Sequence, residues 1–219
     1  MSELLTWTET NGEIRQHVDA EGATADREQM VPRTMDREAL YAALVLSKAK
    51  IEPGLTEDEI DAVEARFGFQ FPPDYGMLLS LGLPTGESWP DWRNGDEALL
   101  RDRLALPVDD LVWEISARDL WWPAWGDRPD SSEVAGAIGR RHLESLAPLI
   151  PIHAYRYLSS YGDQPGNPVF SYFGGSDIIC FSTDLLEYFR DQFSRPQVAR
   201  TDPRGRARRI PFWSDFTGR

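Results

Sequence analysis

The sequence predicts an α+β fold, a single domain in which helices pack on a largely antiparallel mixed sheet. Helical patterns come first and last, and short apolar runs bounded by glycine and proline lie mostly between them. The 219 residues, of which 41% are hydrophobic, suffice for one well-formed core. We expect an N-terminal extension at 1–50 that packs on the main domain, the α+β domain at 51–194, and a basic C-terminal tail at 195–219.

The N-terminal extension is predicted to contain a β-hairpin and a helix. Asn11-Gly12 is a strong two-residue turn signal within Leu4–Val18, because both residues tolerate a positive φ. A polar connector follows at 21–33. Asp36 is placed to cap a helix that runs to about Lys50. The inner face of this helix is expected to carry Leu40, Tyr41, Leu44 and Val45.

Two short helices joined by a proline corner are predicted at 54–82. Thr56 and Glu59 form a capping box, in which each side chain accepts from a backbone N–H of the other residue. Gly68 is expected to end the first helix in a left-handed conformation. The Pro72-Pro73 pair turns the chain, and Asp74 starts the second helix. Its core face is expected to carry Leu78, Leu79 and Leu81.

The middle of the chain alternates loops with short elements. A loop at 84–92 carries two tryptophans, and a helix from Asp96 to Leu104 is expected to stop before Pro107. Leu111–Ile115 is predicted to be a strand. A rigid loop, Pro123–Pro129, then leads to a helix that runs from Ser131 or Ser132 to about Ser145.

The last third is predicted to hold strands and a closing helix. A strand starts at Leu149, and strands at 167–173 and 176–181 form a hairpin that turns at Gly174-Gly175. Because both faces of this hairpin are apolar, we expect it to lie centrally in the sheet. Ser182 or Thr183 is expected to cap the closing helix, whose inner residues are Leu185, Leu186, Phe189 and Phe193. Residues 210–213 are expected to dock as a short last strand.

The charge of the chain is strongly negative and unevenly spread. The formal net charge is −13, and residues 195–219 carry seven arginines against two aspartates, which leaves −18 for residues 1–194. Such a body attracts basic proteins and repels nucleic acid, so we expect a protein partner and no nucleic acid. The basic tail is open to three interpretations: a nucleic-acid contact, a solvated segment, or a segment folded back on the acidic body.

Composition also bears on location. No apolar run approaches the roughly 20 residues that span a bilayer, and no secretory signal precedes the first elements. Cys180 is the single cysteine, so internal disulfides are excluded and a reducing compartment is favoured. Its apolar neighbours indicate a small buried side chain rather than a nucleophile. We therefore expect a cytoplasmic protein with no membrane contact.

No catalytic motif emerges from the residues. The three histidines lack metal-ligand spacing, and neither a phosphate-binding loop nor a nucleophile elbow is present. Asp109-Asp110, just before the predicted strand, could act as an acid site or be a solvated turn. The best hydrolase combination, His153 with Asp177 and Cys180, matches no known order or spacing. We expect no enzyme activity, no metal and no cofactor, and keep an acid-based hydrolase as a remote alternative.

Several short motifs in a shared order resemble the SUKH superfamily, the bacterial relatives of the yeast Smi/Knr cell-wall assembly regulators. The resemblance spans 54–194. The first group of motifs is the helix Thr56–Arg66, then Gly68, Phe71, Pro72, Pro73, Asp74 and Tyr75, and a second helix ending at Gly82. The second group is Trp125–Pro129, Pro151–Leu158, Asn167–Val169, and Asp177, Ile178, Asp184, Leu185 and Tyr188.

The resemblance implies a single α+β domain without catalysis. In bacteria such proteins are mostly immunity proteins that neutralise polymorphic toxins, often nucleases, and in yeast they are regulatory hubs. We therefore expect an immunity protein that binds a basic toxin domain directly, with a regulatory scaffold for several cellular partners as the alternative. The expected partner surface is a set of loop tryptophans and acids, unless the rings are buried and the acids merely solvated. The set is Trp89, Asp91, Trp92, Asp109, Asp110, Trp125 and Asp127.

Overall fold

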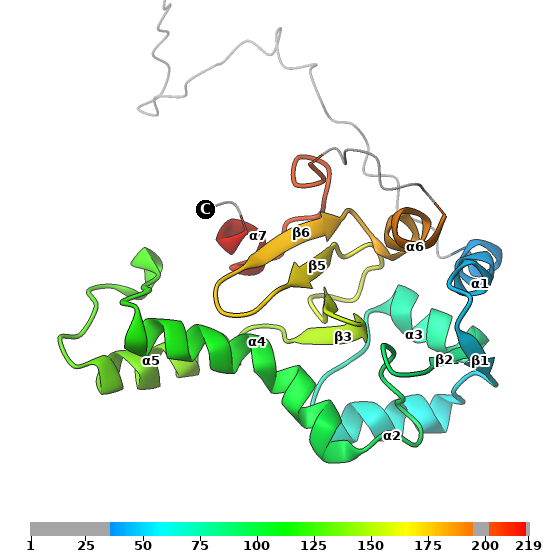
Figure 1. The fold of residues 1–219 in the computed structure, drawn as a ribbon, viewed down its shortest axis with the longest axis horizontal. Coiled ribbons are helices and arrows are strands. Elements are labelled where there is room, and N and C mark those ends of the chain that lie inside the picture. The colour runs from blue at the N-terminus through cyan, green and yellow to red at the C-terminus, as the bar shows by residue number, and fades with distance from the viewer. Residues whose placement is uncertain (1–35, 195–201, 218–219) are drawn as a thin grey trace, which may run out of the picture. The chain divides into compact units, whose positions relative to one another are not determined.

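The computed structural model describes residues 36–194 and 202–217, which belong to one compact unit, Thr34–Arg219. Within these ranges, helices pack on two small antiparallel sheets, so the predicted α+β class is confirmed (Figure 1). The predicted hairpin at 4–18, the connector at 21–33 and the tail residues 195–201 lie outside the described residues.

The first helix, α1 (Arg37–Leu46), starts where the sequence indicates. The carboxylate of Asp36 accepts from the backbone N–H groups of the first turn. Leu40 and Leu44 are buried, but Tyr41 and Val45 are more than half exposed, so the expected inner face is wrong for these two. The helix also ends before Lys50, which begins strand β1 (Lys50–Glu52) instead. The core therefore contacts only a narrow stripe of α1.

The helix pair that follows confirms the local signals. Helix α2 (Glu57–Phe67) starts at the capping box, with Thr56 N–H donating to Glu59 Oε2 at 2.8 Å and Glu59 N–H donating to Thr56 Oγ1 at 3.2 Å. It ends at Gly68, whose φ is +75°. Helix α3 (Pro73–Leu81) then leads into strand β2 (Leu83–Thr85), which pairs with β1.

Close approach of the backbone holds this region together. Leu55 N–H donates to Leu79 O at 2.9 Å, which brings the segment before α2 against the end of α3. A Cβ placed on Gly54 would lie 2.0 Å from the carbonyl oxygen of Ser80. Only glycine fits there, because the opposing atom is backbone and cannot rotate away.

Helix α4 (Glu97–Ala117) differs most from expectation. The helix is 21 residues long and continues through Pro107. The predicted stop before the proline and the predicted strand at 111–115 are therefore both wrong. Leu111 and Ile115 are buried at helical spacing rather than alternating as in a strand. The apolar run at 111–115 is compatible with either a strand or a helix. Pro107 favoured the strand, because proline usually ends a helix.

A hydrogen bond from the sheet explains how α4 passes its proline. Pro107 has no N–H, so the carbonyl of Arg103, four residues earlier, loses its helical donor. The buried hydroxyl of Tyr157 donates to that carbonyl at 3.1 Å. Burial raises the pKa of Tyr157, which keeps the phenol protonated as a donor at neutral pH. The carbonyl of Arg103 thereby regains a hydrogen-bond donor.

Helix α5 (Ser132–Glu144) packs closely along the second half of α4. A short 3-10 turn, η1 (Pro123–Trp125), precedes it. On α5, a Cβ at Gly136 would lie 2.3 Å from Ser116 Oγ, and one at Gly139 would lie 2.5 Å from Ile115 Cδ1. These glycines let the two helices approach, and the predicted helix from Ser131 or Ser132 is confirmed.

The larger sheet has four antiparallel strands in sequence order. They are β3 (Leu149–His153), β4 (Arg156–Ser159), β5 (Val169–Tyr172) and β6 (Ile178–Ser182). The predicted hairpin of the last two strands is confirmed, with positive φ at Gly174 and Gly175. Strand β4 was not predicted. Strand β6 is at the edge rather than at the centre, and its Ile179 is 43% exposed.

Each face of this sheet belongs to a separate hydrophobic core. Alternate residues of one strand go to different cores: Ile150 to the first and Leu149 to the second. The first core joins the sheet to α1, α3 and helix α6 (Leu185–Phe193), and the second joins it to α4, α5 and the C-terminal residues. Both faces of the sheet are therefore covered, as the two apolar faces of the hairpin indicate, although β6 itself lies at the edge.

The C-terminal residues 202–217 fold back on the domain. Ile210, Trp213 and Phe216 are buried in the second core, and residues 213–216 form helix α7 (Trp213–Phe216) rather than the expected strand. Arg206 pairs with Glu187 of α6 at 3.3 Å. Of the three interpretations of the basic tail, folding back on the acidic body describes these residues. The cap of α6 is Asp184, not Ser182 or Thr183.

Candidate functional site

Two of the seven expected partner residues lie in the core. Trp89 is 9% exposed and Trp92 is 1% exposed, so the expectation of exposed tryptophan anchors is wrong at both positions. Trp92 Nε1–H donates to Tyr75 Oη at 3.1 Å, and the ring of Trp89 lies 4.4 Å from that of His153. Burying two large rings closes the end of the first core, the alternative that the sequence left open.

Asp91 shapes the turn at 91–95, which begins between these tryptophans. Its Oδ1 accepts from the N–H groups of Arg93 and Asn94 at 3.1 and 2.9 Å. Arg93 in turn pairs with Glu59 at 2.6 Å, and this guanidinium, with the backbone N–H of Thr56, lowers the pKa of Glu59 to about 2. Asp91 is partly exposed, but its carboxylate already has a structural role.

The two neighbouring aspartates of α4 have different surroundings. Asp109 is exposed and pairs with Arg140 of α5 at 2.8 Å. Asp110 accepts from the hydroxyl of Tyr172 and from Gly175 N–H, which ties α4 to the turn between β5 and β6. This contact raises the pKa of Tyr172, which burial already raises. Asp109 thus lies at the surface in an ion pair with Arg140, and Asp110 is engaged within the fold.

Trp125 and Asp127 lie on the loop that joins α4 to α5. The ring of Trp125 stacks on His142, with ring centres 4.9 Å apart, and on Phe212 at 5.9 Å. It is half-buried, and Asp127 is exposed beside it. The structure therefore keeps Asp109, Trp125 and Asp127 on the α4–α5 region and places Asp91 elsewhere, beside α2.

An apolar pocket lies behind Trp125, but its cavity volume is only about 10 Å³, room for one water molecule. Substrate pockets are generally larger than ~300 Å³ and carry several polar groups. As it stands, this pocket is a packing defect of the second core rather than a substrate site. Its lining residues are Leu111, Ile115, Leu120, Trp121, Trp122, Trp125, Leu143, Phe212 and Phe216.

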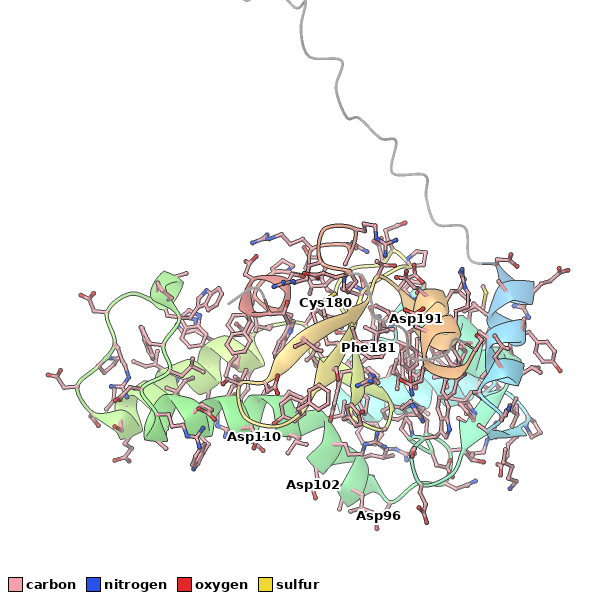
Figure 2. The ribbon with its side chains drawn as sticks, turned by 45° about the horizontal axis from the view of Figure 1, so that its top comes forward. Asp96, Asp102, Asp110, Cys180, Phe181 and Asp191 are labelled. Carbon is pink, nitrogen blue, oxygen red and sulfur yellow. The ribbon has the colours of Figure 1, made fainter. Side chains whose placement is uncertain are left out.

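The hydrolase combination is not assembled in the described residues, where no hydrogen bond joins His153, Asp177 and Cys180. His153 Nδ1 lies 2.7 Å from Tyr188 Oη, and burial, with Arg156 and Arg103 nearby, lowers its pKa to about 4. Burial raises the pKa of Cys180 to about 11, so its thiol is protonated at neutral pH. Cys180 is half-buried on β6, where Figure 2 labels it.

The sequence interpretation missed the surface of α4. Leu99, Leu106 and Trp113 are large apolar residues that the structure leaves exposed, and they are seven residues apart. The seven-residue spacing is visible in the sequence. It went unused because the helix was expected to end before Pro107 and Trp113 was assigned to a strand.

Neither a metal cluster nor a membrane-spanning helix is present in the part of the chain that the structure describes. Across 36–194 and 202–217, no three or more His, Cys, Asp or Glu side chains are grouped to hold a metal ion. In the same ranges, none of the helices has the length and apolarity needed to cross a membrane. Comparisons with protein-family models, with curated proteins and with solved structures found no match to the chain.

Proposed function

We propose that the protein is a non-catalytic binding module, an immunity protein that neutralises a bacterial toxin in the cytoplasm by direct contact. The observation that carries the proposal is the excess of negative charge on the described domain. Residues 1–35 hold seven acids and three arginines, a net −4, which leaves −14 for residues 36–194. Helix α2 alone has five acids and one arginine, and Glu57, Asp58 and Asp61 are exposed on it.

The arginines of the domain do not cancel this excess of negative charge. Several are already committed to acids by ion pairs: Arg93 to Glu59, Arg101 to Glu97, Arg128 to Asp119 and Arg140 to Asp109. The remaining carboxylates create a field that draws a basic protein toward the surface and speeds association. A basic toxin domain, such as a nuclease, is a partner of this kind, and the SUKH resemblance favours the same role.

The proposal predicts that a toxin domain is encoded beside the gene for this chain, and the test uses that domain. Bacteria that express the toxin domain should stop growing, and co-expression of the full chain should restore growth. Calorimetry with the purified pair should give a Kd that weakens at least tenfold between 50 and 300 mM salt. An acidic protein of similar charge serves as the control and should neither protect nor bind. An adjacent gene without a toxin, or co-expression without protection, would contradict the proposal and favour the regulatory scaffold.

A further inference from the structure

Helix α4 has an apolar row on the side that faces away from the protein. Leu99, Leu106 and Trp113 are 64%, 41% and 53% exposed and repeat every seven residues. A helix turns by about 100° per residue, so this row lies roughly 130° around the axis from the buried Leu100 and Leu111. Single exposed apolar residues are common on proteins, but these three repeat at a fixed interval along nearly four turns of one helix face.

Carboxylates alternate with the apolar side chains along this row. Asp102 and Asp109 fall between them, so positions 99, 102, 106, 109 and 113 follow the three-and-four spacing of one helix face. Asp102 is exposed, and Asp109 keeps about half of its side chain exposed beside Arg140. Figure 2 shows Asp96, Asp102 and Asp110 following one another along α4.

Two exposed aromatic rings lie on turns of the sheet that contact α4. Tyr155 and Phe173 are 46% and 54% exposed, and their ring centres are 4.9 Å apart. They belong to turns that α4 holds directly: Arg103 donates to Ala154 O at 2.8 Å, and Asp110 accepts from Gly175 N–H at 3.1 Å. Exposed apolar side chains are therefore also present on the turns that α4 contacts.

The spacing and the charge together indicate what binds there. Seven helical residues span about 10.5 Å, a repeat that a second helix with a seven-residue apolar pattern matches. Side chains on one face of a strand repeat at about 6.8 Å and fall out of register. Carboxylates between the apolar positions favour lysine or arginine between the apolar positions of the partner.

We propose that the outer face of α4, defined by Leu99, Asp102, Leu106, Asp109 and Trp113, is the docking surface for a basic amphipathic helix of the partner protein. The row spans 14 residues, about 21 Å, so the docked helix has about four turns. This inference rests on the proposed function, because it identifies the surface and the partner element of the same binding event.

A designed peptide provides the direct probe. The probe is an 18-residue labelled peptide designed as an amphipathic helix. Leucine repeats every seven residues and at adjacent positions of the same helix face, and lysine lies between the leucines. Fluorescence anisotropy with the full chain should show binding at 50 mM salt at least tenfold tighter than that of a scrambled peptide of the same composition. A version with glutamate in place of lysine should not bind. Equal binding of the designed and scrambled peptides would overturn the proposal.

Variants locate the binding on α4. The double substitution Leu106→Ser with Trp113→Ser should weaken peptide binding at least tenfold, since it removes two of the three apolar positions. Tyr41→Ser with Val45→Ser on α1 removes comparable exposed apolar area elsewhere and should change binding less than twofold. Because all four residues are exposed, both variants should keep the wild-type circular dichroism spectrum. Equal losses in the two variants would refute α4 as the site.

A charge reversal tests the acidic positions separately. Asp102→Lys should weaken peptide binding at least fivefold at 50 mM salt, and much less at 300 mM salt. Glu57→Lys, an equal change of charge on α2, is the matched control and should have a smaller effect. If both reversals weaken binding equally, the peptide senses only net charge, and the defined docking surface is wrong.

The toxin assay separates this inference from the proposed function. If the Leu106→Ser, Trp113→Ser variant protects cells and binds the toxin domain as well as wild type, the docking surface is refuted and the function stands. If the designed peptide binds α4 as expected but no toxin is neutralised, the docking surface stands and the proposed function is refuted. Loss of both protection and toxin binding in this variant supports the docking surface and the proposed function together.

Discussion

The hydroxyl of Tyr157 should be worth far more to stability than an ordinary surface hydroxyl. It is the donor that replaces the N–H missing from Pro107, because it bonds to Arg103 O at 3.1 Å inside the protein. Tyr157→Phe removes only this oxygen and leaves the ring in place. Tyr157 is 2% exposed and this hydrogen bond is partly buried, so water has limited access to the carbonyl that loses its partner.

The expected cost follows from that burial. A buried acceptor left without a donor costs about 1–3 kcal/mol, whereas a typical net hydrogen bond contributes about 1 kcal/mol. We expect Tyr157→Phe to lower the free energy of unfolding by about 2 kcal/mol. For a chain of this size, that corresponds to a fall in Tm of roughly 4–8 °C.

A double-mutant cycle with Pro107→Ala isolates the mechanism. Alanine at 107 supplies a backbone N–H that can donate to Arg103 O, so the carbonyl no longer depends on the tyrosine. In that background, Tyr157→Phe should cost less than about 0.5 kcal/mol, which gives a coupling energy of roughly 1–2 kcal/mol. Urea unfolding followed by tryptophan fluorescence and by circular dichroism measures all four proteins.

Two outcomes would refute this reasoning. If Tyr157→Phe costs the same with proline and with alanine at 107, the tyrosine does not substitute for the missing N–H. If Tyr155→Phe, the control at an exposed tyrosine of the adjacent turn, costs as much as Tyr157→Phe, then the loss is a general effect of the substitution.

Three further predictions concern other parts of the fold. Gly54→Ala should destabilise by about 3 kcal/mol or more in urea unfolding because its Cβ would overlap backbone, while Gly205→Ala, with open space around it, should change stability by less than about 0.5 kcal/mol. His153 has a pKa lowered to about 4 by burial, so the unfolded state binds its proton more tightly, and stability should fall as pH drops from 6.5 to 4. With allowance for partial exposure, about 2 kcal/mol of this fall should be absent in His153→Gln and retained in His142→Gln; a parallel pH profile for all three proteins would contradict this. Because the pKa of Cys180 is raised to about 11, its thiol should react at pH 7.5 at least tenfold more slowly with a disulfide reagent than the thiol of the urea-unfolded chain, and equal rates would show that the site does not protect it.

Structural features that depend only on residues close together in the sequence were predicted well. The capping box at Thr56 and Glu59 and the left-handed Gly68 involve atoms within a few residues of each other, so the sequence contains the whole interaction. The hairpin at Gly174-Gly175 is similarly local. These features fixed the order of most elements and the α+β class.

The errors arose where a distant residue decides the outcome. Pro107 is tolerated because Tyr157, fifty residues later, satisfies the carbonyl, and no local pattern shows this. The burial of Trp89 depends on His153 and on α6, which are remote in sequence. The candidate surface was misjudged for the same reason, since exposure is a property of the packed domain rather than of the loop that carries a residue.

The dependence of the second core on the C-terminal residues has a consequence for synthesis. Trp213 Nε1–H bonds to Ala147 O across 66 residues, and Phe212 and Phe216 pack against the tryptophans of the α4–α5 loop. At 5–20 residues per second, a ribosome needs about 3–13 s to make that interval. During this time the tryptophans of the α4–α5 loop are not yet covered by Phe212 and Phe216. Chaperone binding to the nascent chain should therefore be strongest before residue 216 emerges.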